Sequence, residues 1–269
     1  MRAPNEAARA RSAPLLRTGR ALAASNGVNR KMTFSIPTNI ILIILGFLPS
    51  LVWLSLFLTK DTEPEPKYLI IKVFFLGIIV APIVVLMQAG ISVISNLDFL
   101  PKAATFFLLA AFTEEYMKYW VVKNSVLTKP DFDQPQDAII YMIAAALGFA
   151  AMENMLVIKG VYPGGLASTL GVISLRFTGA TLLHALASGI VGYFLGLAWF
   201  FYHFKKQIIA FGLVLASGLH FAFNSLIFSN PGPSLALNTV LLLGMLVSVL
   251  VLFDKLKTRH KQLIQRLST

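Results

Sequence analysis

The chain has 269 residues, of which 57% are hydrophobic and only 13% are charged, and its mean hydropathy is +0.74. A soluble domain carries about a quarter charged residues, so this composition excludes a soluble protein and indicates an integral membrane protein. The net charge of +11 does not indicate nucleic-acid binding, because the basic residues lie in short loops and at both ends, and the absence of cysteine excludes thiolate metal sites.

The first 31 residues differ in composition from the rest of the chain. They are rich in Arg, Ala and Ser, contain one acidic residue, Glu6, and have no sustained apolar run. Three interpretations stay open: translation that begins at Met32, which we favour, a transit-like peptide, or a disordered tail. We therefore expect a basic N-terminal extension at 1–31, a transmembrane domain at 32–253 and a basic tail at 254–269.

Seven stretches are apolar enough, over about 20 residues, to cross a bilayer as helices. They are Ile36–Leu58, Tyr68–Met87, Ala103–Val122, Ala138–Ile158, Phe177–Phe201, Ile208–Phe228 and Leu235–Phe253. The joining segment Gln88–Lys102 is itself fairly apolar and has room for a re-entrant or interfacial piece. No repeat of 20–50 residues is present, so the predicted fold is an all-α, polytopic transmembrane bundle of about seven spans.

The distribution of basic residues predicts the orientation of this bundle, because Lys and Arg concentrate in cytoplasmic loops. Beyond residue 31, one side of the predicted membrane carries only Lys102 and Lys159, with Arg176 at a boundary. The side of the C-terminus carries eleven: Lys60, Lys67, Lys123, Lys129, Lys205, Lys206, Lys255, Lys257, Arg259, Lys261 and Arg266. We therefore expect a cytoplasmic C-terminus, an orientation with which the Arg-rich residues 1–31 disagree.

The third predicted helix carries Glu114, Glu115 and Lys118 near its middle. Ionisable residues inside a membrane are costly and indicate a functional site. The spacings i,i+4 and i,i+3 let Lys118 neutralise one carboxylate on the same helix face, which leaves the other as a candidate general base. The sequence does not say which glutamate is the base, and a structural ion pair between helices is the alternative.

The fourth predicted helix carries Glu153 and Asn154 close to its end, after a turn that contains Gly148. A glycine on the preceding turns allows another backbone to come close, as tightly packed membrane helices require. A Glu–Asn pair of this kind either belongs to the functional site or serves as a hydrogen-bonding device between helices.

Two further helices each carry a histidine followed one turn later by a polar residue. These pairs are His184 with Ser188 and His220 with Asn224. The i,i+4 spacing places each polar side chain on the same face as its histidine, where it can orient the imidazole or donate to an oxyanion. A lone histidine in an apolar helix is usually a satisfied core residue, but two with matching partners favour a site.

The depths of these residues in the membrane agree with a single cavity. Counted from the non-cytoplasmic ends of the helices, Glu114, Glu153 and the two helical histidines lie roughly 8–17 Å below that surface, at 1.5 Å per residue. The cavity is expected to open toward the non-cytoplasmic face. By the same count His203 and His260 lie near the surface and are excluded.

These motifs together resemble the PrsW family of bacterial intramembrane proteases. The resemblance rests on Glu114-Glu115-x-x-Lys118, Gly148-Phe149-x-x-x-Glu153-Asn154, His184 and His220 in order, and Asp61-Thr-Glu-Pro-Glu-Pro66 after the first span. It covers residues 36–228. The larger clan includes type II CAAX prenyl endopeptidases and bacteriocin-processing proteins, which more often have an arginine at the end of the glutamate motif and a histidine in place of Glu153-Asn154.

The resemblance implies metal-dependent peptide-bond hydrolysis within or beside a bacterial inner membrane. It implies a membrane-anchored protein substrate, such as an anti-sigma factor cleaved on its outer side, and a site made of the double glutamate, Glu153 and the two histidines. Combined with the spacing arguments, the predicted roles are as follows: catalytic Glu114, Glu115 and Asn224; supporting Lys118, Asn154 and Ser188; metal-binding Glu153, His184 and His220, with Zn²⁺ as the metal.

Two other functions use the same kind of residues. Buried Glu, His and Lys chains also form proton relays in coupled transporters, but no repeated halves of the kind found in many carriers are present. A non-catalytic scaffold that binds another membrane protein is the second alternative. Within the protease interpretation, a glutamate that activates water without a metal remains open.

Overall fold

The computed structural model describes residues 37–61, 63–94, 102–229 and 231–268. The predicted extension at 1–31 lies outside these ranges. Within them the chain forms eight α-helices and two short 3₁₀ turns, Tyr162–Gly164 and Tyr202–Phe204, and no strand. The α-helices are α1 (Thr38–Leu58), α2 (Lys67–Ile94), α3 (Lys102–Ser125), α4 (Asp137–Val161), α5 (Leu166–Thr178), α6 (Ala180–Leu197), α7 (Lys205–Ser229) and α8 (Pro231–Ser268).

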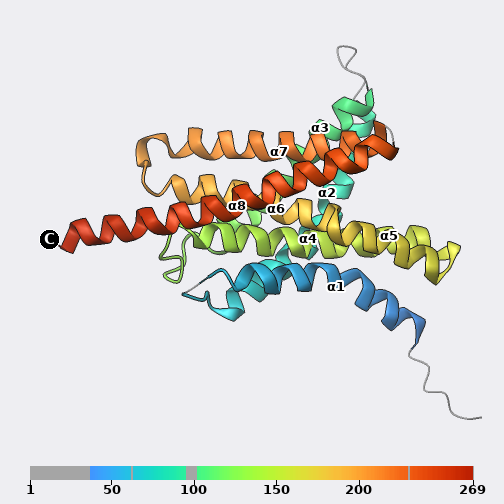
Figure 1. Cartoon of the computed structure of the whole chain (residues 1–269), viewed down its shortest axis with the longest axis horizontal. Coiled ribbons are helices and arrows are strands. Elements are labelled where there is room, and N and C mark those ends of the chain that lie inside the picture. The colour runs from blue at the N-terminus through green and yellow to red at the C-terminus, as the bar shows by residue number, and fades with distance from the viewer. Residues whose placement is uncertain (1–36, 62, 95–101, 230, 269) are drawn as a thin grey trace, which may run out of the picture. The chain divides into compact units, whose positions relative to one another are not determined.

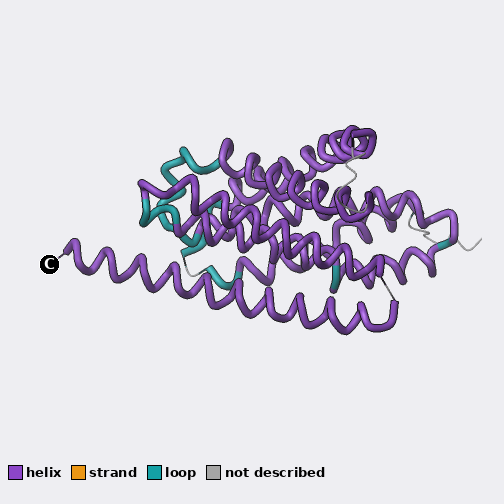
Figure 2. The backbone as a smooth tube through the Cα atoms, turned by 90° about the horizontal axis from the view of Figure 1, so that it is seen from above, coloured by secondary structure: helices purple, strands orange, loops and turns teal. Residues whose placement is uncertain are grey.

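Figures 1 and 2 show this all-helical architecture, which confirms the predicted fold class. Among the described residues, six helical segments are long and apolar enough to cross a membrane: α1, α2, α4, α5 joined to α6, α7, and α8. The charged residues of α3, including Glu114, Glu115 and Lys118, make it too polar for this measure. A seventh crossing by α3 therefore stays a prediction. The predicted basic tail continues α8 as helix to Ser268.

Helix α5 has no counterpart among the predicted spans. The fifth span was expected to begin at Phe177, but α5 ends at Thr178 and α6 begins at Ala180, with Gly179 between them at φ −103° and ψ −96°. Trp53 of α1 donates its indole N–H to the Phe177 carbonyl at 2.8 Å. This bond satisfies a backbone carbonyl that the helix break would leave without a partner.

The first part of the segment predicted to hold a re-entrant or interfacial piece, residues 88–94, is a continuation of α2. That helix runs from Lys67 to Ile94, so Gln88 lies within it. Residues 95–101 of the same segment lie outside the described residues.

Helices α4 and α6 form the buried centre, with α1 and α2 packed on α4 and with α7 and α8 packed on α6. Glycines let the backbones approach closely, as membrane helices commonly do. A Cβ at Gly192 would lie 2.6 Å from the Ile139 Cα, and one at Gly148 would lie 1.9 Å from the Phe74 carbonyl oxygen. The central pair is therefore held by close backbone contact, which fixes the side chains that α4 and α6 carry.

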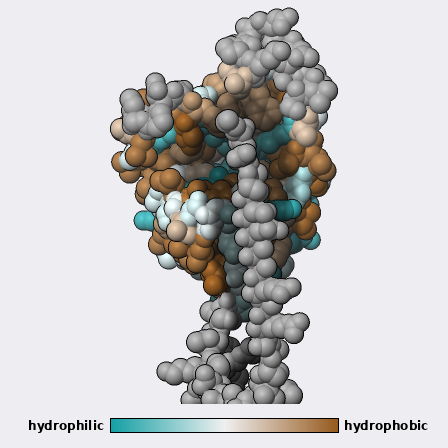
Figure 3. All heavy atoms as spheres, turned by 90° about the vertical axis from the view of Figure 1, so that its right-hand side faces the viewer, coloured by the Kyte–Doolittle hydropathy of each residue, from teal (hydrophilic) through white to brown (hydrophobic). Residues whose placement is uncertain are grey.

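The outer helices turn large apolar side chains away from this centre, as a lipid-facing surface requires. Leu86 of α2 and Phe228 of α7 are among the most exposed of these side chains. Figure 3 views the end of the bundle at which α7 ends and α8 begins, and most of the described surface there is hydrophobic, with hydrophilic residues between. These exposed side chains support a bundle whose solvent is the bilayer.

Candidate active site

Four helices bring the predicted residues together. Helix α3 carries Glu114, Glu115 and Lys118 and packs against α2 and α7. The buried pair α4 and α6 supplies Glu153 and His184. His220 comes from α7, and its ring centroid lies 5.0 Å from that of His184. Residues separated by more than 100 positions in the chain thus share one cluster.

Glu115 is fully buried, and its carboxylate is satisfied on both oxygens. Lys118 Nζ lies 2.8 Å from Oε1, and Ser188 Oγ donates to Oε2 at 2.6 Å. His220 Nδ1 lies 3.1 Å from Oε1. A buried carboxylate with a cation and further hydrogen bonds meets the conditions under which an ion pair is tolerated inside a protein. The sequence left open which glutamate Lys118 neutralises, and the nearer partner is Glu115.

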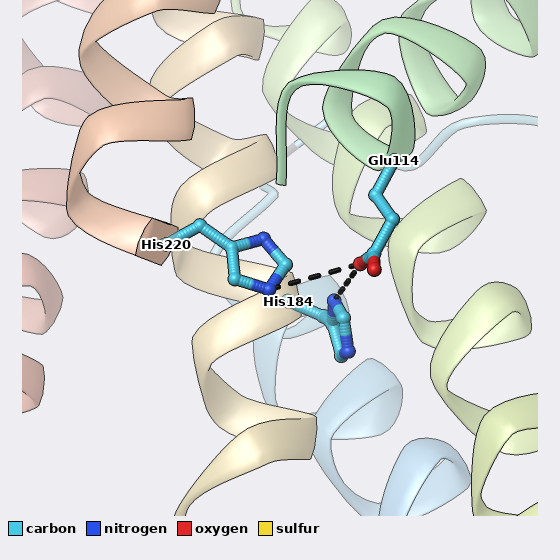
Figure 4. Close-up of side chains that lie close together, drawn as sticks. All are labelled: Glu114, His184 and His220. Atoms are coloured by element: carbon cyan, nitrogen blue, oxygen red, sulfur yellow. Dashed lines mark ion pairs between the residues drawn. The ribbon is translucent and has the colours of Figure 1, made fainter. Parts of the chain in front are cut away.

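Glu114 has a different environment. Its Oε1 accepts a hydrogen bond from Gln88 Nε2 at 2.9 Å. Its Oε2 is buried and has no hydrogen-bond partner among the described residues. That oxygen faces two imidazole nitrogens, His184 Nδ1 at 3.8 Å and His220 Nε2 at 3.7 Å, as Figure 4 shows. Lys118 Nζ lies 3.9 Å from the same oxygen. Glu114 therefore offers the cluster an acceptor to which no described side chain donates a hydrogen bond.

The three facing atoms fit a metal ion. One ligand atom from each of Glu114, His184 and His220 lies within 4.8 Å of the others. The separations of 3.7–3.8 Å are too long for hydrogen bonds. They are close to the roughly 3.4 Å that separates ligands around a tetrahedral ion bound at about 2.0–2.1 Å. Two imidazoles and one carboxylate, with a fourth position open, are a recurrent catalytic zinc set.

Each histidine is also held on its far side by a second carboxylate. His184 Nε2 lies 2.7 Å from Glu153 Oε2, and His220 Nδ1 lies 3.1 Å from Glu115 Oε1. Metal-binding histidines usually donate their other ring N–H to such an oxygen, which fixes the tautomer and the ring orientation. The sequence predicted Glu153 to be a metal ligand. In the structure Glu153 contacts Nε2 of His184, whereas Nδ1 of the same ring faces Glu114.

Lys118 contacts more than its paired glutamate. Its Nζ lies 2.8 Å from His184 Nδ1 and 4.6 Å from the centre of the Phe149 ring. An ammonium group donates to the same imidazole lone pair that would bind a metal ion. A metal at this position would therefore require Lys118 to release His184 and to rely on Glu115.

Arg176 in the last turn of α5 extends the cluster, a role that the sequence did not predict. Its Nη2 donates to Glu153 Oε2 at 2.8 Å, and its Nε donates to Asn154 Oδ1 at 2.6 Å. Asn154 Nδ2 in turn donates to Thr181 Oγ1 at 3.2 Å and to the Gly46 carbonyl at 3.3 Å. The predicted supporting residue Asn154 thus ties α4 to α1, α5 and α6 and positions Arg176 on Glu153.

The remaining predicted residues differ in how closely they join the cluster. Ser188 uses its hydroxyl hydrogen on Glu115, so it is not free to donate to an oxyanion. Asn224 lies one turn after His220 on α7 and is half-buried. No hydrogen bond joins it to the cluster in the described part of the chain. The contact of Gln88 with Glu114 was not predicted either. The sequence feature that indicates it is a single glutamine within an apolar run.

Comparison with known proteins gives a family for this arrangement. Residues 65–252 match the model of the PrsW family intramembrane metalloproteases. The chain is 32% identical to Protease PrsW of Oceanobacillus iheyensis over 181 residues, 66% of this chain and 79% of the relative. It is 31% identical to Protease PrsW of Geobacillus kaustophilus over 185 residues, 66% and 76% of the two chains, and 30% identical to that of Bacillus subtilis over 160 residues, 58% and 67%. No solved structure matches.

Proposed function

The chain belongs to the PrsW family of intramembrane metalloproteases, and from this premise we propose that it hydrolyses a peptide bond of a membrane-anchored protein at the cluster of Glu114, His184 and His220. The observation that carries the proposal is the buried Oε2 of Glu114, which faces two imidazole nitrogens and has no hydrogen-bond partner among the described residues. Leaving a buried acceptor unsatisfied is costly, and a reacting water or a metal ion at this oxygen would satisfy it.

In this proposal Glu114, His184 and His220 hold a divalent metal ion, which we infer to be Zn²⁺ from the nitrogen and oxygen donors. When bound, such an ion supplies Lewis-acid activation of water and of the scissile carbonyl. The proposal moves Glu153 from the predicted ligand set to the outer side of His184. The two outer carboxylates, Glu153 and Glu115, then keep the ring nitrogens that face Glu114 free of protons.

The other side chains prepare the site. Lys118 neutralises Glu115, so that Glu115 holds His220 without adding an uncompensated charge to the membrane interior. Gln88 orients Glu114 through Oε1 and leaves Oε2 for the reacting atoms. We assign Asn224 the role of donor to the developing oxyanion, because it lies one helical turn from His220 and its side-chain amide makes no hydrogen bond within the described residues. Ser188 serves as a positioning residue for Glu115.

The substrate and the topology follow from the resemblance and from the charge distribution. We propose a single-span membrane protein, such as an anti-sigma factor, that is cleaved on the non-cytoplasmic side of a bacterial inner membrane. The eleven basic residues on the side of the C-terminus support a cytoplasmic position for the end of α8. Glu153 lies nearer the C-terminal end of α4, which is the non-cytoplasmic end in this orientation, and its position supports a site that opens toward that face.

Mapping of protein N-termini in membrane fractions tests this function. Cells that express the wild-type chain are compared with cells that express Glu114→Gln, and Glu63→Gln, an exposed glutamate in the loop after α1, is the matched control. We expect new N-termini next to the non-cytoplasmic end of a transmembrane segment in the wild-type and Glu63→Gln samples only. Identical N-termini in all three samples would contradict the proposal.

A further inference from the structure

An apolar groove near the active site is lined mainly by α5, α6, α7 and α8, and also by Trp53 of α1 and Val157 of α4. Its cavity has a volume of about 640 Å³. Its walls are mostly hydrophobic and include Trp53, Leu182, Phe223, Ile227, Leu242 and Leu246. The groove lies between helices that are long and apolar enough to cross the bilayer, so its occupant enters from the lipid.

One buried polar side chain in this groove lacks, within the described part of the chain, a hydrogen-bond donor for its oxygen. Asn238 of α8 is 7% exposed, and its Oδ1 is buried without a hydrogen-bond partner among the described residues. The neighbouring Thr239 differs, because its Oγ1 donates to the Leu235 carbonyl at 2.8 Å on the same helix. An acceptor inside a membrane cannot rely on water, so Asn238 Oδ1 indicates an occupant that brings a hydrogen-bond donor.

One side chain connects the groove with the active-site cluster. Arg176 lines it and donates to Glu153, which contacts His184. Leu182 of the groove lies two residues before His184, and Phe223 lies three residues after His220. A chain segment held in the groove therefore lies against the same two helices that present the imidazoles.

We propose that the groove receives the transmembrane helix of the substrate and that Asn238 accepts a backbone N–H from it where the helix unwinds. The inference rests on the proposed protease function. A peptide bond within an intact helix has its N–H and C=O occupied by helix hydrogen bonds, so hydrolysis requires local unwinding, which frees N–H groups. An acyl chain would fill the apolar walls equally well but has no donor for Asn238.

Substitution of Asn238 distinguishes a substrate-binding role of its side chain from a structural role. Asn238→Leu removes an acceptor that has no partner in the described protein and replaces it with an apolar side chain of similar size. The variant should therefore fold as well as the wild type or better. Binding of a helix that offers a freed N–H should weaken roughly 5- to 10-fold, as expected for the loss of one hydrogen bond.

Photo-cross-linking in vesicles tests the proposal without requiring catalysis. Benzoylphenylalanine replaces Leu243, an exposed groove residue, or Leu86, a lipid-facing residue of α2, in the Glu114→Gln background. The probe is a biotinylated single-span Leu/Ala helix interrupted by a Gly-Ser pair, in phosphatidylcholine and phosphatidylglycerol vesicles. We expect cross-links to the probe at Leu243 well above those at Leu86, a loss in Asn238→Leu, and no change in Thr239→Val.

Several outcomes would overturn the groove assignment. These are equal yields at the two positions, cross-links to lipid alone, no cross-link at Leu243, or the same yield in Asn238→Leu. A lower unfolding temperature of Asn238→Leu would make the amide structural and would also overturn it. Because the probe is bound by an inactive variant, a failure here leaves the protease function standing, and a failure to find cleavage leaves the binding result interpretable.

Discussion

A cluster of carboxylates lies toward each end of helix α4, and the two clusters differ in their partners. Near its C-terminal end, Glu153 joins Glu114 and Glu115 among two histidines, Lys118 and Arg176. At its start, Asp137 lies with Glu65 and Asp61 of the loop after α1, and within the described residues no Lys, Arg or His forms an ion pair with these three. Positive partners keep carboxylates ionised and useful for chemistry, while carboxylates without them favour the neutral form.

The cluster at the start of α4 has the features of a structural device. Glu65 accepts a hydrogen bond from the Tyr141 hydroxyl, and Asp137 Oδ2 accepts one from the Gln134 backbone N–H at 2.8 Å. Burial raises the pKa of Glu65, and it also raises the pKa of Asp61. The Asp61–Pro66 motif that contributes to the family resemblance is therefore used to attach the loop after α1 to α4, at the opposite end from the Glu114 cluster.

The largest expected difference between the clusters is in catalysis. Glu114→Gln removes the carboxylate that faces both histidines, and the rate of substrate cleavage should fall by about 100-fold or more. Glu65→Gln keeps the hydrogen-bonding shape of the loop cluster and should leave the rate near that of the wild type. Both are measured as cleavage rates of the substrate found by N-terminal mapping, at equal protein levels. Equal losses of cleavage rate in the two variants would contradict the assignment of catalysis to the Glu114 cluster alone.

The second expected difference is in stability. Lys118→Met leaves Glu115 buried without its cation, and the free energy of unfolding should fall by about 3–5 kcal/mol. Replacing both residues, as Lys118→Met with Glu115→Gln, should recover part of that loss. Lys72→Met is the control, because the exposed Lys72 of α2 has its Nζ 3.5 Å from the Ser125 carbonyl and no buried charge to neutralise. Unfolding by denaturant in detergent micelles measures all three, and equal effects of the two lysine changes would show that the pair is not buried as described.

The smallest expected difference is in pH dependence. A carboxyl whose pKa is raised in the folded state stabilises the fold fully below its unfolded pKa, and that contribution is lost as pH rises through the folded pKa. For Glu65 the loss begins near 4.5 and continues upward to the raised folded pKa. Glu65→Gln should flatten this part of the curve of unfolding temperature against pH relative to the wild type. If the curve of the variant ran parallel to that of the wild type, the pKa of Glu65 would not be raised in the folded protein.

The sequence predicted the helical bundle and most residues of the Glu114 cluster, but not how these residues pair with one another. Hydropathy and spacing sufficed for the all-helical membrane bundle. They also sufficed for the meeting of the Glu114–Glu115 pair, His184 and His220, because these lie near the middle of three separate predicted spans. The partner of Lys118 and the outer position of Glu153 depend on how α3, α4 and α6 are rotated against one another. Side-chain spacing along a single helix does not contain that information.

Arg176 escaped prediction for a related reason. The break at Gly179 separates α5 from α6, and without α5 the sequence placed this arginine at a loop boundary. Its role as the partner of Glu153 depends on the helix that carries it. Gln88 was missed because its helix extends beyond the predicted span, to Ile94.

Metal analysis of the purified protein is the sharpest test of the site formed by Glu114, His184 and His220. Metal content and Co²⁺ binding are measured for the wild type, Glu114→Gln and Glu65→Gln, and substrate cleavage is followed through chelation and Zn²⁺ restoration. We expect about one bound zinc per chain in the wild type and in Glu65→Gln, its loss in Glu114→Gln, and cleavage that stops on chelation and returns with zinc. Full cleavage by metal-free protein, or zinc retained by Glu114→Gln, would contradict the assignment of Glu114, His184 and His220 as the metal site.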